Sequence, residues 1–440
     1  MDWRQAIGER WEEIVRDLAA LVAIRSVGGE AEPGAPYGAG PRTALDYMLR
    51  RAEEMGFETA VVDDRVGYVS YGVQQPHAAV LLHLDVVPEG DGWTLPPFAL
   101  TRREGRLYGR GVSDNKGAAV CALHCLDLIR REGLTGARGL RLIFGTDEER
   151  GMGDMKAYIE REPLPEFGFV PDSEYPIISR EKGILQLDVT LPFRPYGVRS
   201  LEGGASYNLA PGLCRAELDR DFAPLAEQIG FRGRVRGTEV EAAGDQLHAM
   251  LADRGENACV ELLRLLAADG DARMDTLFQL LSDPYGEGLG IACEDAPSGK
   301  LTVCVGQMRL TEEGLYLSLD CRYPVTKDGG ALTEAVRRAL SPLGAEVAVH
   351  QDDPPLYVWD DSEIVKRLSA AYEDLTGERC ETLCTGGGSY ARRFGGRMVG
   401  FGPLFPGTPE TFHRPDEYLD EEALRRHAEI CGAAMALLLR

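Results

Sequence analysis

Hydrophobic residues recur at helical spacing in the first part of the chain. From Trp11 to Val22 the apolar positions fall three and four residues apart, and the segment from Ala44 to Met55 repeats this pattern. Such spacing places the apolar side chains on one face of a helix. Residues 116–131 and 153–161 also favour helices. We therefore expect amphipathic helices that pack on a common core.

Continuous apolar runs alternate with these helices. They cover residues 78–87, 140–144 and 167–170, and polar or turn residues bound each of them. Runs of this kind are typical of strands that are buried on both faces of a sheet. The order strand, helix, strand, helix, strand predicts an α/β domain whose helices cover a mostly parallel sheet.

The pattern changes after about Gly183. Apolar and polar residues now alternate with a period of two, which indicates strands, and short helical patterns lie between them. The segments are 185–189, 301–305 and 315–319 for strands, and 257–268 and 274–281 for helices. This pattern of strands and short helices predicts a second domain of the α+β class.

The α/β pattern returns after Pro354 and Pro355. A helix is expected near 362–376, a strand near 397–401 and a last helix from Asp420. The sheet domain is therefore discontinuous, and a chain of 440 residues is long enough for two cores. The expected domains are 1–184 with 355–440, and the insertion 185–354.

Charge and composition exclude several classes of partner. The formal net charge of -23 is spread along the chain, and no cluster of Lys and Arg is present, so neither nucleic acid nor a membrane is an expected partner. The chain starts without the pattern of a signal peptide and has no long apolar run, so we expect a cytoplasmic protein. Its ten cysteines are too dilute for a disulfide scaffold, and the pairs Cys121/Cys125 and Cys380/Cys384 are interpreted as small buried residues rather than ligands.

Residues that can bind metal ions follow the predicted strands. His83 and Asp85 lie two apart on one face of a strand, three acidic residues occupy 147–149, and Asp172 follows the third strand. The carboxyl ends of parallel strands open at one edge of a sheet, where sites form. Asp114 and His413 are further candidates, although Asp114 alone could cap a helix and the acidic turn alone could be solvated. Together, these residues predict a metal centre.

These segments resemble the M20 metallopeptidase family, in their order and in their separation. The similarity extends from the first helix through Trp93 and the ligand segments to the Gly386–Arg392 stretch, which is nearly the whole chain. It is closest to the bacterial dipeptidase branch, the PepV-like or Sapep-like enzymes. The resemblance implies a zinc-peptidase-like catalytic domain with an inserted lid domain.

The resemblance also implies a cofactor of two divalent metal ions. One ion is expected on His83, Asp114 and Asp172, and the other on Asp114, Glu149 and His413. Asp114 would bridge the two ions, and the family often has a cis peptide after this residue. Mixed His and carboxylate ligands suit Zn²⁺, Mn²⁺ or Co²⁺, and Zn²⁺ is the metal expected from the resemblance.

Catalytic roles follow from the same resemblance. Glu148 corresponds to the general base, and Asp85 to a carboxylate that orients the imidazole of His83. His248 corresponds to a lid histidine that stabilises charge on the carbonyl oxygen of the substrate. The family commonly has Pro-Glu after this histidine, where the chain has Ala252 and Asp253.

Substrate-binding residues are expected in the lid and near the C-terminal segment. Asn208 resembles a lid asparagine, and Arg322 resembles an arginine that binds the substrate carboxylate, with a structural ion pair as its alternative role. Gly387, Gly388 and Ser389 would bring main chain close to the substrate. The insertion is large enough to supply His248 from the same chain, so we expect a monomer, with a dimer as the alternative.

The resulting hypothesis is a dipeptidase that cleaves short peptides with a free C-terminal carboxylate. The alternative is a deacylase of the N-acyl amino acid or succinyl-diaminopimelate type, which would use the same metals on a different amide. A third hypothesis, a metal-binding homologue without catalysis, is disfavoured because Glu148 and all expected ligands are present.

Overall fold

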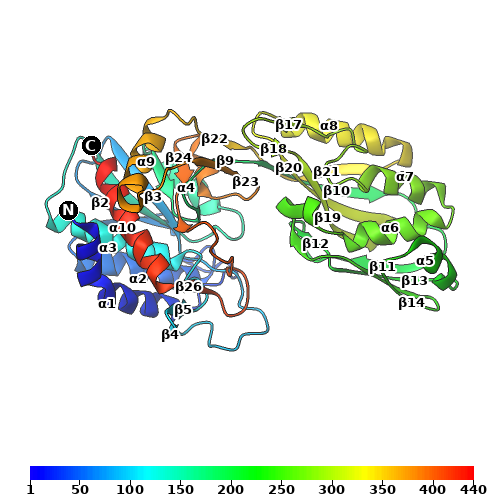
Figure 1. The fold of residues 1–440 in the computed structure, drawn as a ribbon, viewed down its shortest axis with the longest axis horizontal. Coiled ribbons are helices and arrows are strands. Elements are labelled where there is room, and N and C mark those ends of the chain that lie inside the picture. Colours follow the sequence, from blue (N-terminus) through cyan, green and yellow to red (C-terminus); the bar gives the residue numbers. More distant parts are fainter. The chain divides into compact units, whose positions relative to one another are not determined.

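The computed structural model describes residues 1–440, which divide into two compact units (Figure 1). Unit 1 comprises Met1–Ser179, Tyr357–Leu383 and Ser389–Arg440. Unit 2 comprises Arg180–Leu356 and Cys384–Gly388. The structure has no helix that is long and apolar enough to cross a membrane.

Unit 1 contains most residues of a nine-stranded sheet of order β1-β2-β6-β3-β7-β24-β9-β22, with β23 beside β9. The four central strands, β6, β3, β7 and β24, are parallel, and β1 and β2 are antiparallel at one edge. The strands are β1 (Glu58–Val62), β2 (Val66–Tyr71), β3 (His77–His83), β6 (Gly139–Gly145), β7 (Gly168–Val170), β9 (Ile177–Glu181), β22 (Leu356–Tyr357), β23 (Thr382–Thr385) and β24 (Met398–Gly400). Every residue of β3 and β6 is buried, and the predicted mixed α/β fold with a largely parallel sheet is confirmed.

The helices of unit 1 agree with the helical patterns in the sequence. They are α1 (Trp3–Val22), α2 (Ala39–Glu54), α3 (Lys116–Arg131), α4 (Gly153–Arg161), α9 (Glu363–Thr376) and α10 (Glu421–Leu438), with the short η3 (Tyr390–Phe394). Strand β3 ends at His83, earlier than the apolar run that continues to Val87. The chain leaves the sheet there, because Ser26 Oγ donates to Leu84 O and Val86 N donates to Ser26 O.

Short strands complete unit 1. A three-stranded sheet joins β4 (Thr101–Arg103), β5 (Arg106–Tyr108) and β26 (Tyr418–Asp420), and a two-stranded one joins β8 (Ser173–Glu174) and β25 (Pro403–Leu404). The pairing of β5 with β26 matters for the site, because it brings the segment after His413 beside the segment before Asp114.

Unit 2 contains an eight-stranded sheet of order β14-β15-β13-β11-β19-β20-β10-β21, whose neighbours are antiparallel. The strands are β10 (Gly183–Leu191), β11 (Val198–Gly203), β13 (Leu213–Leu218), β14 (Gly233–Arg236), β15 (Glu239–Ala243), β19 (Thr302–Leu310), β20 (Leu315–Tyr323) and β21 (Glu346–Asp353). Further elements are α5 (Ala223–Ile229), α6 (Ala258–Ala268), α7 (Ala272–Leu281), α8 (Gly329–Leu340), β12 (Leu209–Ala210), β16 (Leu247–His248), β17 (Glu294–Asp295), β18 (Gly299–Lys300), η1 (Ala249–Arg254) and η2 (Ser341–Leu343). Alternate residues of the strands enter one apolar core with these helices.

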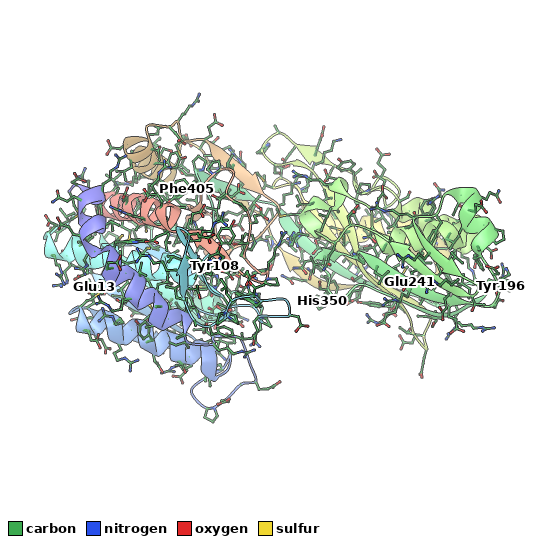
Figure 2. All side chains as sticks on the ribbon, turned by 60° about the horizontal axis from the view of Figure 1, so that its bottom comes forward. Glu13, Tyr108, Tyr196, Glu241, His350 and Phe405 are labelled. Carbon is green, nitrogen blue, oxygen red and sulfur yellow. The ribbon has the colours of Figure 1, made fainter.

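The face of this sheet opposite the core carries a row of side chains of alternating charge. Glu241, one of them, is labelled in Figure 2. Strand register places opposite charges beside one another across five strands, in the order Arg309, Glu202, Arg215, Glu241 and Arg234. Opposite charges on neighbouring strands stabilise a sheet by a few tenths of a kcal/mol to about 1 kcal/mol per pair. Because the three arginines and two glutamates of this row alternate, it offers no single-sign surface to a charged ligand.

Candidate metal centre

The candidate ligands lie at the carboxyl ends of the parallel strands of unit 1. His83 is the last residue of β3, Glu148 and Glu149 occupy the turn after β6, and Asp172 follows β7. Asp114 ends the turn that leads into α3. Parallel strands open at the same edge, so sequence segments far apart in the chain meet there.

Two imidazoles and three carboxylates meet at this edge. His83 Nε2 lies 2.7 Å from Asp114 Oδ1 and 3.5 Å from Asp172 Oδ2. His413 Nε2 lies 3.0 Å from Asp114 Oδ2 and 3.1 Å from Glu149 Oε2. Asp114 therefore presents one oxygen to each imidazole, which is the arrangement that a bridging carboxylate needs.

Two groups of donor atoms are close enough to share a cation. One atom from each of His83, Asp114 and Glu149 lies within 4.8 Å of the others, and the same holds for His83, Glu148 and Asp172. Imidazole nitrogen and carboxylate oxygen together suit Zn²⁺, Mn²⁺ or Co²⁺. The donor set thus fits the expected metals, although these groups differ from the expected ligand sets: His413 is in neither, and Glu148, the expected base, is in the second.

The carboxylates raise one another's pKa values. Burial, followed by the charge of Asp172, raises the pKa of Glu148 well above its ordinary value. Burial and Asp114 raise the pKa of Glu149 to about 7. Burial would also raise the pKa of Asp114, but His83 and His413 hold it far below the usual range. This excess of negative charge is what a bound cation would neutralise.

The pKa values of the two imidazoles are also raised, against the effect of burial. Burial lowers the pKa of His83, but Asp172 and Asp114 outweigh burial and raise it well above its ordinary value. Asp114 and Glu149 likewise raise the pKa of His413 to about 11 against the effect of burial. Since a proton and a metal ion compete for the same imidazole nitrogen, a site that attracts a proton this strongly also fits a cation.

Asp85 holds the turn that carries Glu148 and Glu149. Its carboxylate accepts hydrogen bonds from Glu148 N at 3.2 Å and Glu149 N at 3.1 Å. Its main-chain oxygen lies 3.0 Å from His83 Nδ1, whereas its Oδ1 lies 3.5 Å from the same nitrogen. Asp85 therefore contacts the imidazole mainly through its main chain and the glutamate turn through its side chain.

The peptide bond between Asp114 and Asn115 is cis, as the family resemblance implied. Asn115 Nδ2 donates to Pro171 O, and it lies 3.3 Å from Asp172 Oδ1. This contact joins the turn before α3 to the segment after β7.

Asp154 supports the site but was not predicted from the sequence. This buried carboxylate accepts hydrogen bonds from Thr146 N, Asp147 N and the hydroxyl of Tyr390. The ring of Tyr390 lies edge-on to His83, with the ring centres 6.4 Å apart. An acidic residue in the first turn of a helix carries no sequence signal that distinguishes this role from charge at an exposed helix start.

Unit 2 brings Asn208 and His248 together. Ala249 N donates to Asn208 O at 2.8 Å, and β12 pairs with β16, so that Leu209 lies opposite His248. Met250 N donates to His248 Nδ1 at 3.2 Å. Since Nδ1 accepts this hydrogen bond, the neutral ring carries its proton on Nε2.

Arg322 and the glycine-rich segment also meet within unit 2. Arg322 binds Asp320 through Nε and Nη2, at 2.6 and 3.0 Å, and its Nη1 donates to Gly386 O at 3.0 Å. These contacts use three of the five N–H groups of the guanidinium. Gly387 N donates to Thr385 Oγ1, while Ser389, in unit 1, accepts a hydrogen bond from Ala391 N.

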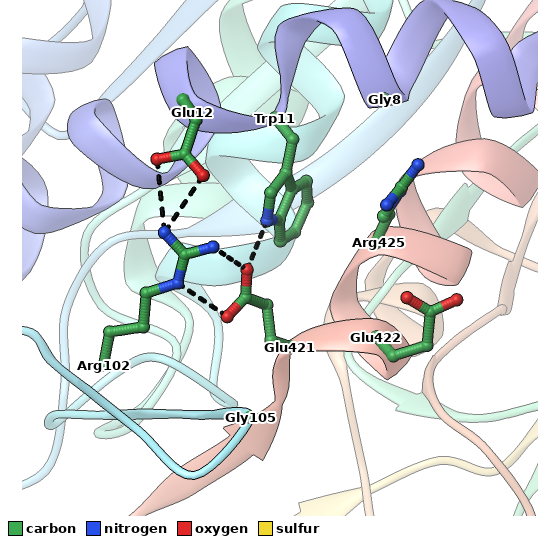
Figure 3. A pocket seen from close by; sticks show the side chains of 8 residues that line it. All are labelled: Gly8, Trp11, Glu12, Arg102, Gly105, Glu421, Glu422 and Arg425. Atoms are coloured by element: carbon green, nitrogen blue, oxygen red, sulfur yellow. Dashed lines mark hydrogen bonds and ion pairs between the residues drawn. The ribbon is translucent and has the colours of Figure 1, made fainter.

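A surface hollow lies away from the candidate ligands, between α1, α10 and the β4–β5 turn (Figure 3). Arg102 crosses it and binds Glu421 and Glu12, while Trp11 Nε1 donates to Glu421 Oε1 at 2.6 Å. The polar groups of these residues bind one another (Figure 3). These contacts connect α1, β4 and α10. No residue of the hollow belongs to the groups of side chains that could hold a metal ion.

Comparisons with known proteins show the family of the chain. The chain matches peptidase family M20/M25/M40 over residues 79–436. It is 33% identical, over 99% of both chains, to a Bacillus subtilis protein named "Putative dipeptidase YtjP". It is 29% identical, over 96% of both chains, to a Staphylococcus aureus protein named "Putative dipeptidase SAB1611c". The chain therefore belongs to peptidase family M20/M25/M40 and is a dipeptidase-like hydrolase.

Solved structures share the fold. Human carnosine dipeptidase 1 has a TM-score of 0.62 at 16% identity and is matched over 98% of its chain and 99% of this one. The dipeptidase Dug1p from Saccharomyces cerevisiae has a TM-score of 0.64 at 13% identity, over 98% of its chain and 100% of this one. YXEP from Bacillus subtilis, described as a dinuclear metal binding peptidase, has a TM-score of 0.57 at 14% identity, over 98% of its chain and 97% of this one.

Proposed function

We propose that the protein is a two-metal dipeptidase that hydrolyses short peptides with a free C-terminal carboxylate. The observation that carries this proposal is Asp114, whose two oxygens face His83 and His413 separately. Asp172 and Glu149 complete the two expected ligand sets. Zn²⁺ is the favoured metal, with Mn²⁺ and Co²⁺ as alternatives.

The chain's own residues account for proton transfer. When bound, two divalent cations would lower the pKa of a water molecule and stabilise charge on the substrate carbonyl. Glu148 takes a proton from the attacking water and passes it to the amine that leaves. The hydrogen bond from Glu148 N to Asp85 fixes the main chain from which this carboxylate projects.

Residues of unit 2 are proposed to bind the substrate. His248, with its proton on Nε2, suits donation to the carbonyl oxygen as negative charge develops there. Arg322 retains two N–H groups beyond its bonds to Asp320 and Gly386, and these suit a substrate carboxylate. Asn208 and the glycines of 386–388 would contact the peptide main chain. One chain supplies all these residues, so we propose an active monomer.

The nearly full-length similarity to proteins named as dipeptidases favours a dipeptide substrate. A deacylase for N-acyl amino acids is the second candidate, because the same ligands would serve another amide. A mixed pool of dipeptides, tripeptides and N-acyl amino acids, with Zn²⁺ or Mn²⁺ added, separates the two by mass spectrometry. Loss of dipeptides alone supports the proposal, loss of acylated amino acids alone favours the deacylase, and no loss with either metal refutes both.

Replacement of Glu148 tests its role as the base. Glu148 belongs to neither of the two expected sets of metal ligands, so as the general base it should leave both metal ions bound in Glu148→Ala. Loss of one ion would instead assign Glu148 as a ligand of the group that it forms with His83 and Asp172. Its turnover should fall by a factor of about 10² to 10⁴, the usual contribution of a general base. Metal content by plasma emission spectroscopy and kcat on a dipeptide measure the two effects. Retained turnover would rule out Glu148 as the base.

A further inference from the structure

Glu417 is a buried carboxylate that stands four residues after His413 and directly before β26. Only 1% of its surface is exposed. Its Oε1 accepts hydrogen bonds from Ser113 N at 3.0 Å, Gly111 N at 3.1 Å and Asp114 N at 3.4 Å. One oxygen thus accepts hydrogen bonds from three main-chain N–H groups of the turn that carries Asp114.

The turn is shaped around this carboxylate. Gly111 has a φ of 89°, a left-handed conformation that side chains rarely adopt. A Cβ there would lie 2.9 Å from atoms of Lys116 and Val86. Gly109 N also donates to the main-chain oxygen of Glu417 at 3.0 Å. The segments of Asp114 and His413 are therefore joined through both the side chain and the main chain of Glu417.

Arg110 extends the connection to the segment after β3. It donates to Glu417 Oε2 at 2.7 Å, and its Nη2 donates to Pro88 O and Glu89 O. Its guanidinium also lies over the ring of Trp93, 5.1 Å from the ring centre. Like Glu417, Arg110 is 1% exposed, so each of the two buried charges depends on the other.

We infer that Glu417 is a positioning residue that sets the separation of Asp114 and His413, and thereby the affinity for the cation these two residues share with Glu149. This inference rests on the proposed metal centre. Without the carboxylate charge, Arg110 Nη1 loses its anionic acceptor and the three main-chain N–H groups keep at most a neutral oxygen, so the turn would rearrange. Loss of a residue that orients metal ligands typically lowers metal affinity 10- to 100-fold.

The two cations should respond unequally. His83 and Asp172 stand on segments that Glu417 does not contact, so the cation that they bind keeps two ligands in place. The other cation takes both Asp114 and His413, the two residues that Glu417 connects, and only Glu149 is independent. We therefore expect one weakened site and one that changes little.

The test compares Glu417→Gln with Asp416→Asn in the full-length protein. The glutamine keeps one oxygen for the main-chain N–H groups but presents an amide N–H to Arg110. Asp416 is a matched control, because it bonds Thr94 and Leu95 and does not contact the Asp114 turn. Zn²⁺ affinities come from competition with a chromogenic chelator, and thermal unfolding of the metal-free proteins reports stability.

The expected result is that Glu417→Gln weakens one of two Zn²⁺ sites 10- to 100-fold, whereas Asp416→Asn binds as the unmodified protein does. Two unchanged affinities, with or without a lower unfolding temperature, would overturn the inference. If Glu417→Gln does not fold, Arg110→Lys, which removes the planar fork and keeps the charge, should weaken the same site, and unchanged affinities would again overturn it. An unmodified protein that binds no Zn²⁺, Mn²⁺ or Co²⁺ would instead refute the proposed function, on which the inference rests.

Discussion

His77 differs from His83 in the same strand, because no carboxylate contributes to the shift of its pKa. It stands at the start of β3, six residues before His83, and Gln75 Nε2 lies 2.9 Å from its Nδ1. Burial, followed by the charge of Arg141, lowers the pKa of His77 from 6.5 to about 4. The same residue type in the same strand therefore has its pKa shifted in opposite directions by different neighbours.

His77 should make the stability of the protein depend on pH. Between pH 6.5 and 4 the unfolded chain binds a proton that folded His77 does not, so the free energy of unfolding falls as the pH decreases through this window. At 1.36 kcal/mol per pKa unit, the full effect is about 3 kcal/mol, present above pH 6.5 and lost by pH 4. Urea unfolding at pH 7.5 and 4.5 measures it.

His77→Phe provides the comparison, because it removes the titrating group and replaces the imidazole with an apolar ring. The variant should lose about 2 kcal/mol less stability than the unmodified protein between the two pH values. Equal losses in both proteins would assign the pH dependence to other groups.

At the scale of elements, the sequence predicts what depends on local pattern. The helices at 116–131 and 153–161 and the apolar strands at the centre of unit 1 are visible as periods of hydrophobic residues. The contacts of Asp85 and Glu417 with main-chain N–H groups are not visible in the sequence, because every residue type except proline carries such a group. Sequence shows the ligands, whereas the groups that hold them emerge only with the fold.

Helix α3 follows the Asp114 turn and is fixed by a buried ionic contact. Asp127 is fully buried and accepts hydrogen bonds from Arg10 on α1 and from Arg130 on its own helix. Arg131 contributes a further ion pair at 2.8 Å. Removal of one member of a buried ion pair commonly costs about 3 to 5 kcal/mol, because the other charge stays buried.

Asp127→Ala should therefore lower the free energy of unfolding by about 3 kcal/mol. Arg131→Ala is the control within the same cluster, since the Arg131 side chain is 57% exposed and an exposed ion pair contributes less than about 1 kcal/mol. Chemical unfolding of the three metal-free proteins at pH 7 measures both changes. Similar small losses in the two variants would mean that Arg10 finds another acceptor.

At the scale of the whole molecule, the chain divides its candidate residues between two units. The ligands belong to unit 1, whereas Asn208, His248 and Arg322 belong to unit 2. The structure also assigns Cys384–Gly388 to unit 2, which a hydrophobic pattern cannot show, because five residues have no period of their own. Two hydrogen bonds account for it, from Lys182 N to Thr385 O and from Arg322 Nη1 to Gly386 O.

This division makes metal binding and catalysis separable by mutation. His248→Ala removes a proposed donor to the substrate carbonyl oxygen and touches no metal ligand, so Zn²⁺ content and affinity should remain unchanged. Loss of one such donor lowers kcat by a factor of about 10² to 10³. Kinetics on a dipeptide and chelator competition measure the two quantities. An unchanged kcat would show that His248 has no role in the reaction. Loss of Zn²⁺ would show that the variant disturbs the metal ligands of unit 1. Only a lower kcat at full metal content supports the proposed role.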